Sequence, residues 1–241
     1  VARIDFKLNQ WGIRRDTDHQ TLQIPSPEPD EALLRTYSER RSVRDFANGL
    51  LPFAQFGQFL RSLAPIEMDG LPKYRYASGG GLYPVQTYLY IKPDRIEGIP
   101  GGVYYYHPKQ NQLLLMSSEA RLDNSTQAPH NREIFDKAAF VIFLLGQLKA
   151  IEPLYGGLAR DFCLLEAGHI SQFLMMVAPA HQIGLCPIGA MEFEPIRHFF
   201  HLEESHVLLQ LLFGGEMGSE PPEIPVTGAT SMPGAAGQGT D

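Results

Sequence analysis

Three short segments of the sequence concentrate side chains that can bind anions or exchange protons. The first is ERRSVR at residues 39–44, in which three guanidinium groups and one hydroxyl lie close together. The forked donors of arginine match the oxygens of a phosphate group, and a serine hydroxyl adds a neutral donor. The spacing therefore predicts a phosphate contact, with an ordinary solvated basic stretch as the alternative.

The second segment is LPKYRYASGGGLYP at residues 71–84. Its three successive glycines permit a ligand to approach the backbone closely and leave N–H groups free to donate. Lys73, Tyr74 and Ser78 place acid–base and hydrogen-bonding groups beside these glycines. The pattern matches neither of the common nucleotide-binding loops, so a glycine-rich turn before a strand is the alternative.

The third segment is IGLCPIGA at residues 183–190, which follows a long apolar stretch. Its backbone would permit a flat ligand to lie against it, but the pattern favours a simple connector from a helix to a strand. Within the preceding stretch, Glu166, His169 and Gln172 are spaced i, i+3 and i+6, so a helix places them on one stripe. We expect this stripe to face a cofactor or a partner subunit, or to form a satisfied polar patch at an interface.

Other common kinds of site lack the patterns that they need. His198 and His201 have helical spacing, but there is no HExxH motif, and Cys163 and Cys186 are 23 positions apart, so we expect no metal site. No GxSxG motif occurs, which argues against a serine hydrolase. Two cysteines also exclude a disulfide scaffold and favour a reduced, cytoplasmic setting.

The composition is that of a globular chain. The 241 residues carry a formal net charge of −7, and 44% of them are hydrophobic. The acidic balance argues against nonspecific nucleic-acid binding, which needs a basic surface. The first thirty residues are charged and resemble no signal peptide. The apolar run at 138–148 is too short to span a bilayer, and the one at 162–179 contains polar side chains, so we expect a soluble protein without a membrane contact.

Periodicity places these segments on an α+β framework. Apolar spacing predicts three helices, and β-forming or continuous apolar runs predict five strands, two of them joined as a hairpin. The helices are expected at 29–40, 52–63 and 158–181, and the strands at 86–92, 102–107, 112–116, 138–145 and 207–213. Because the helices and strands interleave around an antiparallel hairpin, α+β is the predicted fold class.

Composition shifts divide the chain into three parts. The prolines at 25, 27 and 29 separate an N-terminal arm, residues 1–28, from a body at residues 29–215. Residues 216–241 contain nine Gly or Pro, four acidic residues, and no aromatic or basic residue. Such a segment cannot bury enough apolar area to offset its ordering entropy, so we predict a flexible linker or tail there.

The order of the motifs is more specific than any one of them. ERRSVRDF, LPKYRYASGGGLYPVQTYLYI, GVYYYHP, ARDFCLLEAGHISQFLMMVA and GLCPIGAM follow one another between residues 39 and 191. This order resembles the nitroreductase-like flavin oxidases, and most of all the azoline-oxidising (Ox) domains of nonribosomal peptide synthetases, and the resemblance covers about residues 3–215. The resemblance implies a mixed, mostly antiparallel sheet of four to five strands wrapped by helices. It also implies a homodimer with FMN at the subunit interface, a substrate tethered to a peptidyl carrier protein, and neighbouring synthetase domains as partners.

The resemblance assigns cofactor roles to matching positions. One set matches the contacts to the FMN phosphate and ribityl chain, a second the loop that lines the flavin, and a third the strand-side segment over the isoalloxazine ring. In order, these are Arg40, Arg41, Ser42 and Arg44; Ser78, Gly79, Gly80 and Gly81; and Pro187, Ile188, Gly189 and Ala190, with Gln172 as a further match. Related proteins supply a late Lys or Arg to the phosphate, whereas residues 214–216 here read GGE. The early arginines are therefore expected to carry more of the phosphate charge.

The resemblance also implies catalytic residues. Lys73 and Tyr74 match a Lys–Tyr pair used by related oxidases, which predicts a Tyr74 phenolate, its pKa lowered by Lys73, as the base that removes the α proton of a thiazoline or oxazoline. The flavin would accept the hydride, and dioxygen would reoxidise it. Three alternatives stay open: dehydrogenation of a tethered amino acid such as glutamine, an NAD(P)H-dependent nitroreductase, and a catalytically silent docking domain.

Overall fold

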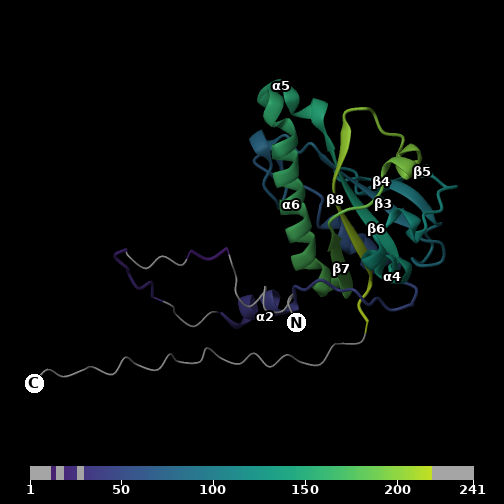
Figure 1. The fold of residues 1–241 in the computed structure, drawn as a ribbon, viewed down its shortest axis with the longest axis horizontal. Coiled ribbons are helices and arrows are strands. Elements are labelled where there is room, and N and C mark those ends of the chain that lie inside the picture. Colours follow the sequence, from purple (N-terminus) through teal and green to yellow (C-terminus); the bar gives the residue numbers. More distant parts are fainter. Residues whose placement is uncertain (1–11, 15–18, 26–29, 219–241) are drawn as a thin grey trace, which may run out of the picture. The chain divides into compact units, whose positions relative to one another are not determined.

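The computed structural model describes residues 12–14, 19–25 and 30–218 (Figure 1). The chain divides after Leu34 into two units, which are treated separately. Most of the predicted arm at 1–28 lies outside the described residues, and its described stretches, 12–14 and 19–25, contain no helix or strand. Of the predicted tail, residues 219–241 lie outside the described part of the chain. Both predictions therefore stay predictions.

The second unit is built on a six-stranded sheet in which every neighbouring pair is antiparallel. The strand order is β5-β4-β3-β6-β8-β7. The strands are β3 (Val85–Ile91), β4 (Gly102–His107), β5 (Gln112–Ser117), β6 (Phe140–Gln147), β7 (Ile183–Ile188) and β8 (His206–Glu216). A separate two-stranded ribbon joins β1 (Ile66–Met68) to β2 (Leu71–Lys73). The predicted α+β class and the β4–β5 hairpin are confirmed, and the sheet has more strands than the resemblance implied.

Helices flank this sheet, and the longest lies along one face (Figure 1). The α-helices of this unit are α3 (Phe53–Arg61), α4 (Arg132–Lys137), α5 (Glu152–Tyr155) and α6 (Ala159–Val177), whereas α2 (Glu31–Glu39) runs across the boundary between the two units. Short 3₁₀ turns are η1 (Gly79–Gly81), η2 (Asn124–Thr126), η3 (Pro129–Asn131), η4 (Leu148–Ala150), η5 (Gly156–Leu158), η6 (Ala178–His181) and η7 (Glu194–Phe200). The helix predicted to reach His181 becomes a 3₁₀ turn after Val177, where Pro179 removes a backbone donor.

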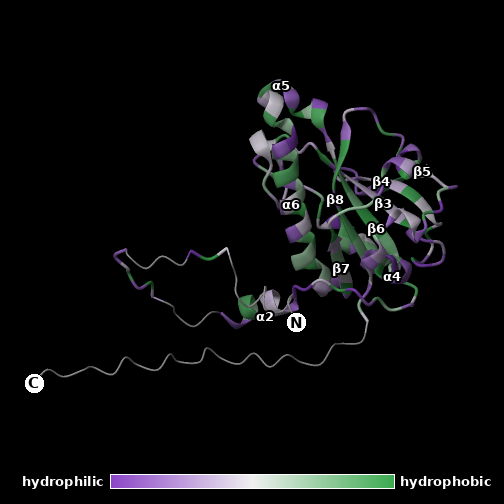
Figure 2. Ribbon diagram, in the orientation of Figure 1, coloured by the Kyte–Doolittle hydropathy of each residue, from purple (hydrophilic) through white to green (hydrophobic). Residues whose placement is uncertain are grey.

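The sheet has a core on each face, which explains the continuous apolar run of β6. Alternate residues of a strand point to opposite faces. Ile142 and Leu144 enter the core beneath α3 and α6, whereas Val141, Phe143 and Leu145 enter the core beneath α4 and η7. Figure 2 shows the resulting band of hydrophobic strands between more polar outer segments. A strand buried on both faces needs apolar side chains at every position.

One stretch among the described residues, Glu152–His181, is long and apolar enough by length and composition to cross a membrane. It contains α6, whose inward residues Cys163, Ile170 and Leu174 are fully buried in the core. The core helix of a globular protein passes the same test. The stretch is therefore weak evidence for a membrane span and agrees with the predicted buried helix.

The connector predicted at 183–190 is wrong for its first six residues, which form the edge strand β7. Gly184 and Pro187 lower the local β propensity, but pairing along β8 overrides it, and an edge strand tolerates proline. Residue 184 must be a glycine because a Cβ there would lie only 2.6 Å from Val43 Cγ1. Long-range packing, which composition does not reveal, decides this element.

The last strand runs further than predicted. β8 continues through Gly214 and Gly215 to Glu216, and Met217 forms a bridge with Phe46. Composition marked Glu216 as the first residue of the tail, yet it pairs with Ile183 of β7. Both glycines pack closely against aromatic rings, which occupy the space that a side chain would need.

Candidate active site

The candidate residues gather around one end of the sheet. Val85 of β3 lies opposite Gly146 of β6, which lies opposite Val207 of β8. Ile188, the last residue of β7, pairs with Leu211 further along β8. The starts of β3 and β8 and the ends of β6 and β7 therefore share this end. The glycine loop leads into it, and Gly189 leaves from it.

The glycine loop, defined here as residues 77–85, is fixed to α6 by a buried carboxylate. The Ser78 hydroxyl donates to Glu166 Oε2, and the Val85 N–H donates to Glu166 Oε1 at 3.2 Å. The Tyr83 N–H in turn donates to Ser78 Oγ at 2.9 Å. Glu166 is 1% exposed, and burial raises the pKa of this carboxyl to about 7. His169 Nδ1 lies 3.0 Å from the carbonyl oxygen of Ala77, which adds a second contact from α6.

Tyrosines wall a pocket of about 290 Å³ beside this loop, which we call the tyrosine pocket. The ring of Tyr74 lies 4.1 Å from that of Tyr83 and 5.5 Å from that of Tyr76, centroid to centroid. Polar and apolar groups of β3 and β4 complete the walls. The lining residues are Leu63, Tyr74, Tyr76, Tyr83, Val85, Gln86, Thr87, Tyr105, Tyr106, His107, Pro108 and Lys109. The pocket thus joins a predicted catalytic residue to the loop predicted to line the flavin.

The pKa of Tyr74 is raised, whereas the predicted activation by Lys73 requires a lowered one. Lys73 ends the ribbon strand β2 and is exposed, whereas Tyr74 is buried. Burial raises the pKa of Tyr74, and the neighbouring groups Tyr105, Tyr83 and Glu166 raise it further. Because an uncharged phenol is favoured in such surroundings, Tyr74 is a proton donor at neutral pH rather than a phenolate.

The arginine segment lies against β7, an edge strand of the sheet. The Val43 N–H donates to the carbonyl oxygen of Leu185 in β7 at 2.8 Å, which sets the segment two residues before Pro187. Arg40 and Arg41 are half-buried, and their guanidinium groups make no hydrogen bond or ion pair within the part of the chain that the structure describes. Half-buried guanidinium groups without protein acceptors suit a phosphate. Arg44 donates to the carbonyl oxygen of Ser42 at 3.3 Å.

A larger pocket, about 670 Å³, opens beside the end of β7. Gly189 and Ala190 line it, together with residues of η7 and the start of β8. A Cβ built on Gly189 would meet nothing within 4 Å, so its backbone borders open space. Gln172 is exposed on α6 and lines neither pocket. Of the predicted stripe on α6, only Glu166 and His169 contact the glycine loop.

Within one chain, the predicted cofactor residues form two groups rather than one. The arginine segment and the end of β7 make one group, and the glycine loop with Tyr74 makes the other. β6 and β8 lie between β3 and β7 in the sheet. Three strand spacings separate these strands, or about 14 Å.

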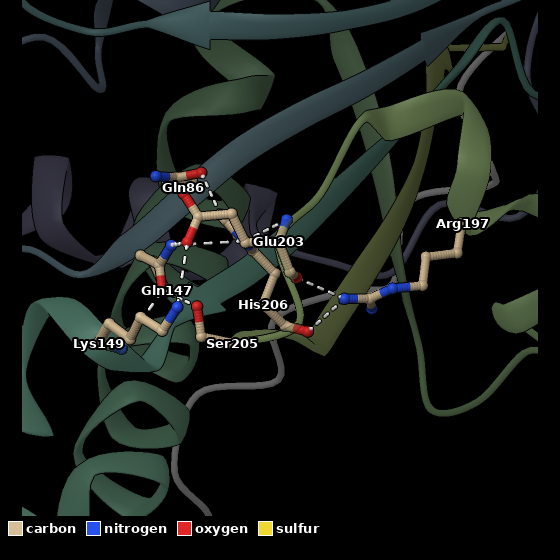
Figure 3. Close-up of polar contacts among 7 residues, drawn as sticks. All are labelled: Gln86, Gln147, Lys149, Arg197, Glu203, Ser205 and His206. Carbon is tan, nitrogen blue, oxygen red and sulfur yellow. Dashed lines mark hydrogen bonds and ion pairs between the residues drawn. The ribbon is translucent and has the colours of Figure 1, made fainter.

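A polar network that sequence reasoning missed lies between the two pockets (Figure 3). His206 is buried, with Nε2 3.1 Å from Gln86 Oε1, and its Nδ1 accepts the N–H of Glu203 at 3.2 Å. That N–H can only donate, so Nε2 carries the ring proton. Burial lowers the pKa of His206, which keeps the ring neutral. Gln86 lines the tyrosine pocket and His206 lines the larger one.

The rest of the network ties the turns at this end together. Gln147 accepts the Ser205 hydroxyl at 2.6 Å, and Arg197 donates to the carbonyl oxygens of Glu203 and His206 at 2.7 and 3.1 Å (Figure 3). In the sequence, the only signal is a polar residue, Gln86, Gln147 or His206, at or next to the end of each of three strands. That signal does not say which of these residues meet.

The sequence pattern of the nitroreductase family matches residues 37–215. The chain belongs to the nitroreductase family. The matched range contains the arginine segment, the glycine loop, α6 and the end of β7, so all of the candidate residues belong to the family domain. As a member, this chain is a nitroreductase-family oxidoreductase by descent, and its fold is the nitroreductase-like α+β fold.

Two relatives of this nitroreductase-family chain are indigoidine synthases. The chain is 28% identical over 226 residues to that of Dickeya dadantii, a match covering 81% of this chain and 14% of the relative. It is 32% identical over 134 residues to that of Streptomyces lavendulae, covering 55% of this chain and 9% of the relative. The chain thus spans only a small part of each relative.

Among solved structures, this nitroreductase-family chain is similar to the E. coli microcin synthetase McbBCD complex with truncated pro-MccB17 bound. The TM-score is 0.69, with 88% of this chain and 81% of that chain covered at 17% identity. At that identity the likeness shows a shared fold.

Proposed function

We propose that this nitroreductase-family domain is an FMN-dependent oxidase that dehydrogenates a carrier-tethered thiazoline or oxazoline to a thiazole or oxazole. One observation carries the proposal: Tyr74 and the glycine loop meet at one pocket, with Tyr74 stacked on Tyr83 at 4.1 Å. A predicted acid–base residue and the loop predicted to line the flavin thus border the same pocket. A flat five-membered ring suits a pocket walled by tyrosines.

The residues present fit an FMN. Arg40 and Arg41 are half-buried cations whose guanidinium groups have no acceptor among the described residues, and a phosphate supplies one. Gly81 and Gly189 have nothing within 4 Å of a built Cβ, so a flat ring can approach their backbone. A bound flavin supplies the two-electron acceptor for the hydride and passes the electrons to dioxygen.

The division of these residues supports a homodimer. Because β6 and β8 separate the two groups, a second copy of the chain would bring its glycine loop to the arginine segment of the first. α6 also exposes apolar side chains, among them Leu164 at 45% and Leu165 at 59% exposure. We infer that the complete site forms between two copies.

In this proposal Tyr74 acts as a phenol. Conversion of an azoline to an azole removes one proton from the α carbon, which water or a base at the pocket would accept, and one hydride from the β carbon, which a bound flavin would accept. Removal of that proton places negative charge on the carbonyl oxygen of the tethering thioester. The buried Tyr74 hydroxyl can donate to that oxygen, and a hydrogen bond at a site of developing charge lowers the barrier.

A second candidate is Cα–Cβ dehydrogenation of a tethered amino acid such as glutamine. The similarity to two indigoidine synthases favours it over the remaining alternatives, because both matches fall within large synthases. The tyrosine pocket offers Gln86 and Thr87 as amide- or hydroxyl-binding groups. The two candidates share the flavin and differ in the substrate.

Anaerobic mixing separates these functions. The purified protein should contain FMN, and a carrier-bound methylthiazoline should bleach the flavin and lose two hydrogens, as followed by absorbance and mass spectrometry. Bleaching by carrier-bound glutamine alone would support the second candidate. Rapid bleaching by NADPH would instead support a reductase, and protein that binds no FMN would contradict both oxidase proposals.

A further inference from the structure

Glu166 has a role that the proposed function does not yet include. Its carboxylate is 1% exposed and is the acceptor of two donors of the glycine loop, the Ser78 hydroxyl and the Val85 N–H. A buried carboxylate is costly unless its oxygens are hydrogen-bonded. Here both oxygens are used, and both partners lie in the same nine-residue loop. The loop and α6 are therefore joined at both ends of the glycine run.

The loop needs these hydrogen bonds because its backbone conformation is unfavourable by itself. Gly80 and Gly81 have φ of 61° and 67°, and Tyr83, which has a side chain, has φ of 52°. A bulky residue in the left-handed region persists only where its surroundings hold it. The Tyr83 N–H donates to Ser78 Oγ, and Ser78 donates to Glu166. The carboxylate thus stabilises the conformation of Tyr83 through one hydroxyl.

The position of Tyr83 affects the tyrosine pocket through contacts between aromatic rings. Its ring lies 4.1 Å from the ring of Tyr74 and 5.8 Å from the ring of Tyr76. A change at Glu166 can therefore reach Tyr74 without any contact between the two side chains. The path consists of two hydrogen bonds and one ring contact.

We infer that Glu166 is a positioning residue, whose two hydrogen bonds hold the glycine loop and, through Ser78 and Tyr83, set the position of Tyr74. The inference rests on the proposed function for its effect on turnover, but its effect on the loop does not. The ionised carboxylate accepts from both donors, and the protonated carboxyl can still accept the Val85 N–H while it donates to Ser78 Oγ. Both forms therefore join the loop to α6.

Protonation of this group falls in an accessible range of pH. Burial raises the pKa of Glu166 to about 7, while the hydrogen bonds from Ser78 and Val85 and the charge of His169 oppose that rise. The other titratable groups that sense its charge are Cys163 on α6 and Tyr74 and Tyr76 beside the loop, and their pKa values are raised. These three are neutral near pH 7, so Glu166 is the group of this cluster whose shifted pKa lies there.

Hydrogen exchange of the full chain tests the inference directly. In the parent protein, exchange at the Tyr83 and Val85 amides, corrected for intrinsic pH dependence, should become about tenfold faster between pH 6 and pH 8, because the pKa of Glu166 is raised in the closed loop and its ionisation therefore favours opening. Glu166→Gln keeps the shape and an acceptor oxygen but cannot ionise, so its exchange should be free of this pH step. Glu166→Ala removes both hydrogen bonds, so its exchange at these amides should be faster at every pH. Asp161→Asn removes an exposed charge from the same helix and should behave as the parent.

Turnover supplies a second readout. With the carrier-bound substrate, Glu166→Ala should lower kcat about tenfold with little change in KM, and the shape-conserving Glu166→Gln should retain most of the parent kcat. Unchanged exchange at both amides in a folded Glu166→Ala variant would overturn the inference. Absence of turnover in every variant, with the exchange result as expected, would contradict the proposed function and leave the positioning role supported.

Discussion

The two groups of candidate residues differ in how their polar atoms are satisfied. Around the glycine loop, the hydroxyl of Ser78, the carboxylate of Glu166 and the Val85 N–H satisfy one another within the protein. In the arginine segment, Arg40 and Arg41 have no such partners among the described residues. The first group is thus positioned before any ligand arrives, whereas the second has donors that a ligand would use. Positioning and binding are divided between the interior strand β3 and the edge strand β7.

The largest effect is expected at the arginine segment. Replacing Arg40 and Arg41 together by Ala removes two charged donors, each contributing about 1.5–3 kcal/mol to a phosphate contact. FMN affinity should fall by about a hundredfold or more, while the free energy of unfolding of the apoprotein changes little. Flavin fluorescence titration and denaturant melts measure the two quantities.

The exposed Arg121 provides a control, because Arg121→Ala removes the same charge from the loop after β5. Its FMN affinity should equal that of the parent. If the double variant bound FMN as tightly as the parent, the arginine segment would not be the phosphate site, and the contrast between the two groups would fail.

The next effect is expected at the tyrosine pocket. Tyr74→Phe removes one hydroxyl and keeps the ring contact with Tyr83, so the pocket should remain folded. Loss of a proton donor at the reacting group typically costs about a hundredfold in rate, and we expect that loss in kcat with normal FMN binding. Single-turnover bleaching measures it. Tyr76→Phe, in the same cluster, should change the rate far less, and equal losses in both variants would argue against a special role for Tyr74.

A smaller effect should follow from crowding beneath the arginine segment. Gly184→Ala places a Cβ 2.6 Å from Val43 Cγ1, which forces the segment away from β7. Such overpacking costs about 1–3 kcal/mol of unfolding free energy. FMN affinity should fall with it, whereas exchange at the Val85 amide should stay as in the parent. A change in both the FMN affinity and the exchange at the Val85 amide would show that the two groups are coupled.

The smallest effect is expected in the pH dependence of the free energy of unfolding. The pKa of Glu166 is raised on folding, so the native state holds its proton at pH values where the unfolded chain has lost it. The free energy of unfolding should therefore fall as pH rises from about 4.5 to about 7, by at most about 1.4 kcal/mol per pH unit. Glu166→Gln should remove this part of the slope in urea melts at a series of pH values. An unchanged slope would place the pKa of Glu166 near its ordinary range.

Local patterns predicted much of the framework. The apolar run of β6, the turn between β4 and β5, and the helical spacing of α3 and α6 each depend on neighbours in the sequence, and all are confirmed. The same holds for the motifs, since the family match includes every segment singled out. Glycine content did not predict what each glycine does in the structure. Gly80 and Gly81 serve a backbone conformation, whereas Gly184 and Gly214 are required by close packing.

By itself, then, the sequence determined the α+β class, the nitroreductase family and the residue types available for chemistry, because periodicity and motif order are local properties. Only the tertiary structure decided that residues 183–188 form an edge strand, that Glu166 joins the glycine loop, and that Gln86 meets His206. It also decided that Tyr74 is a buried phenol. Each of these depends on atoms far apart in the chain, and burial, pairing and pKa arise only where folding brings such atoms together.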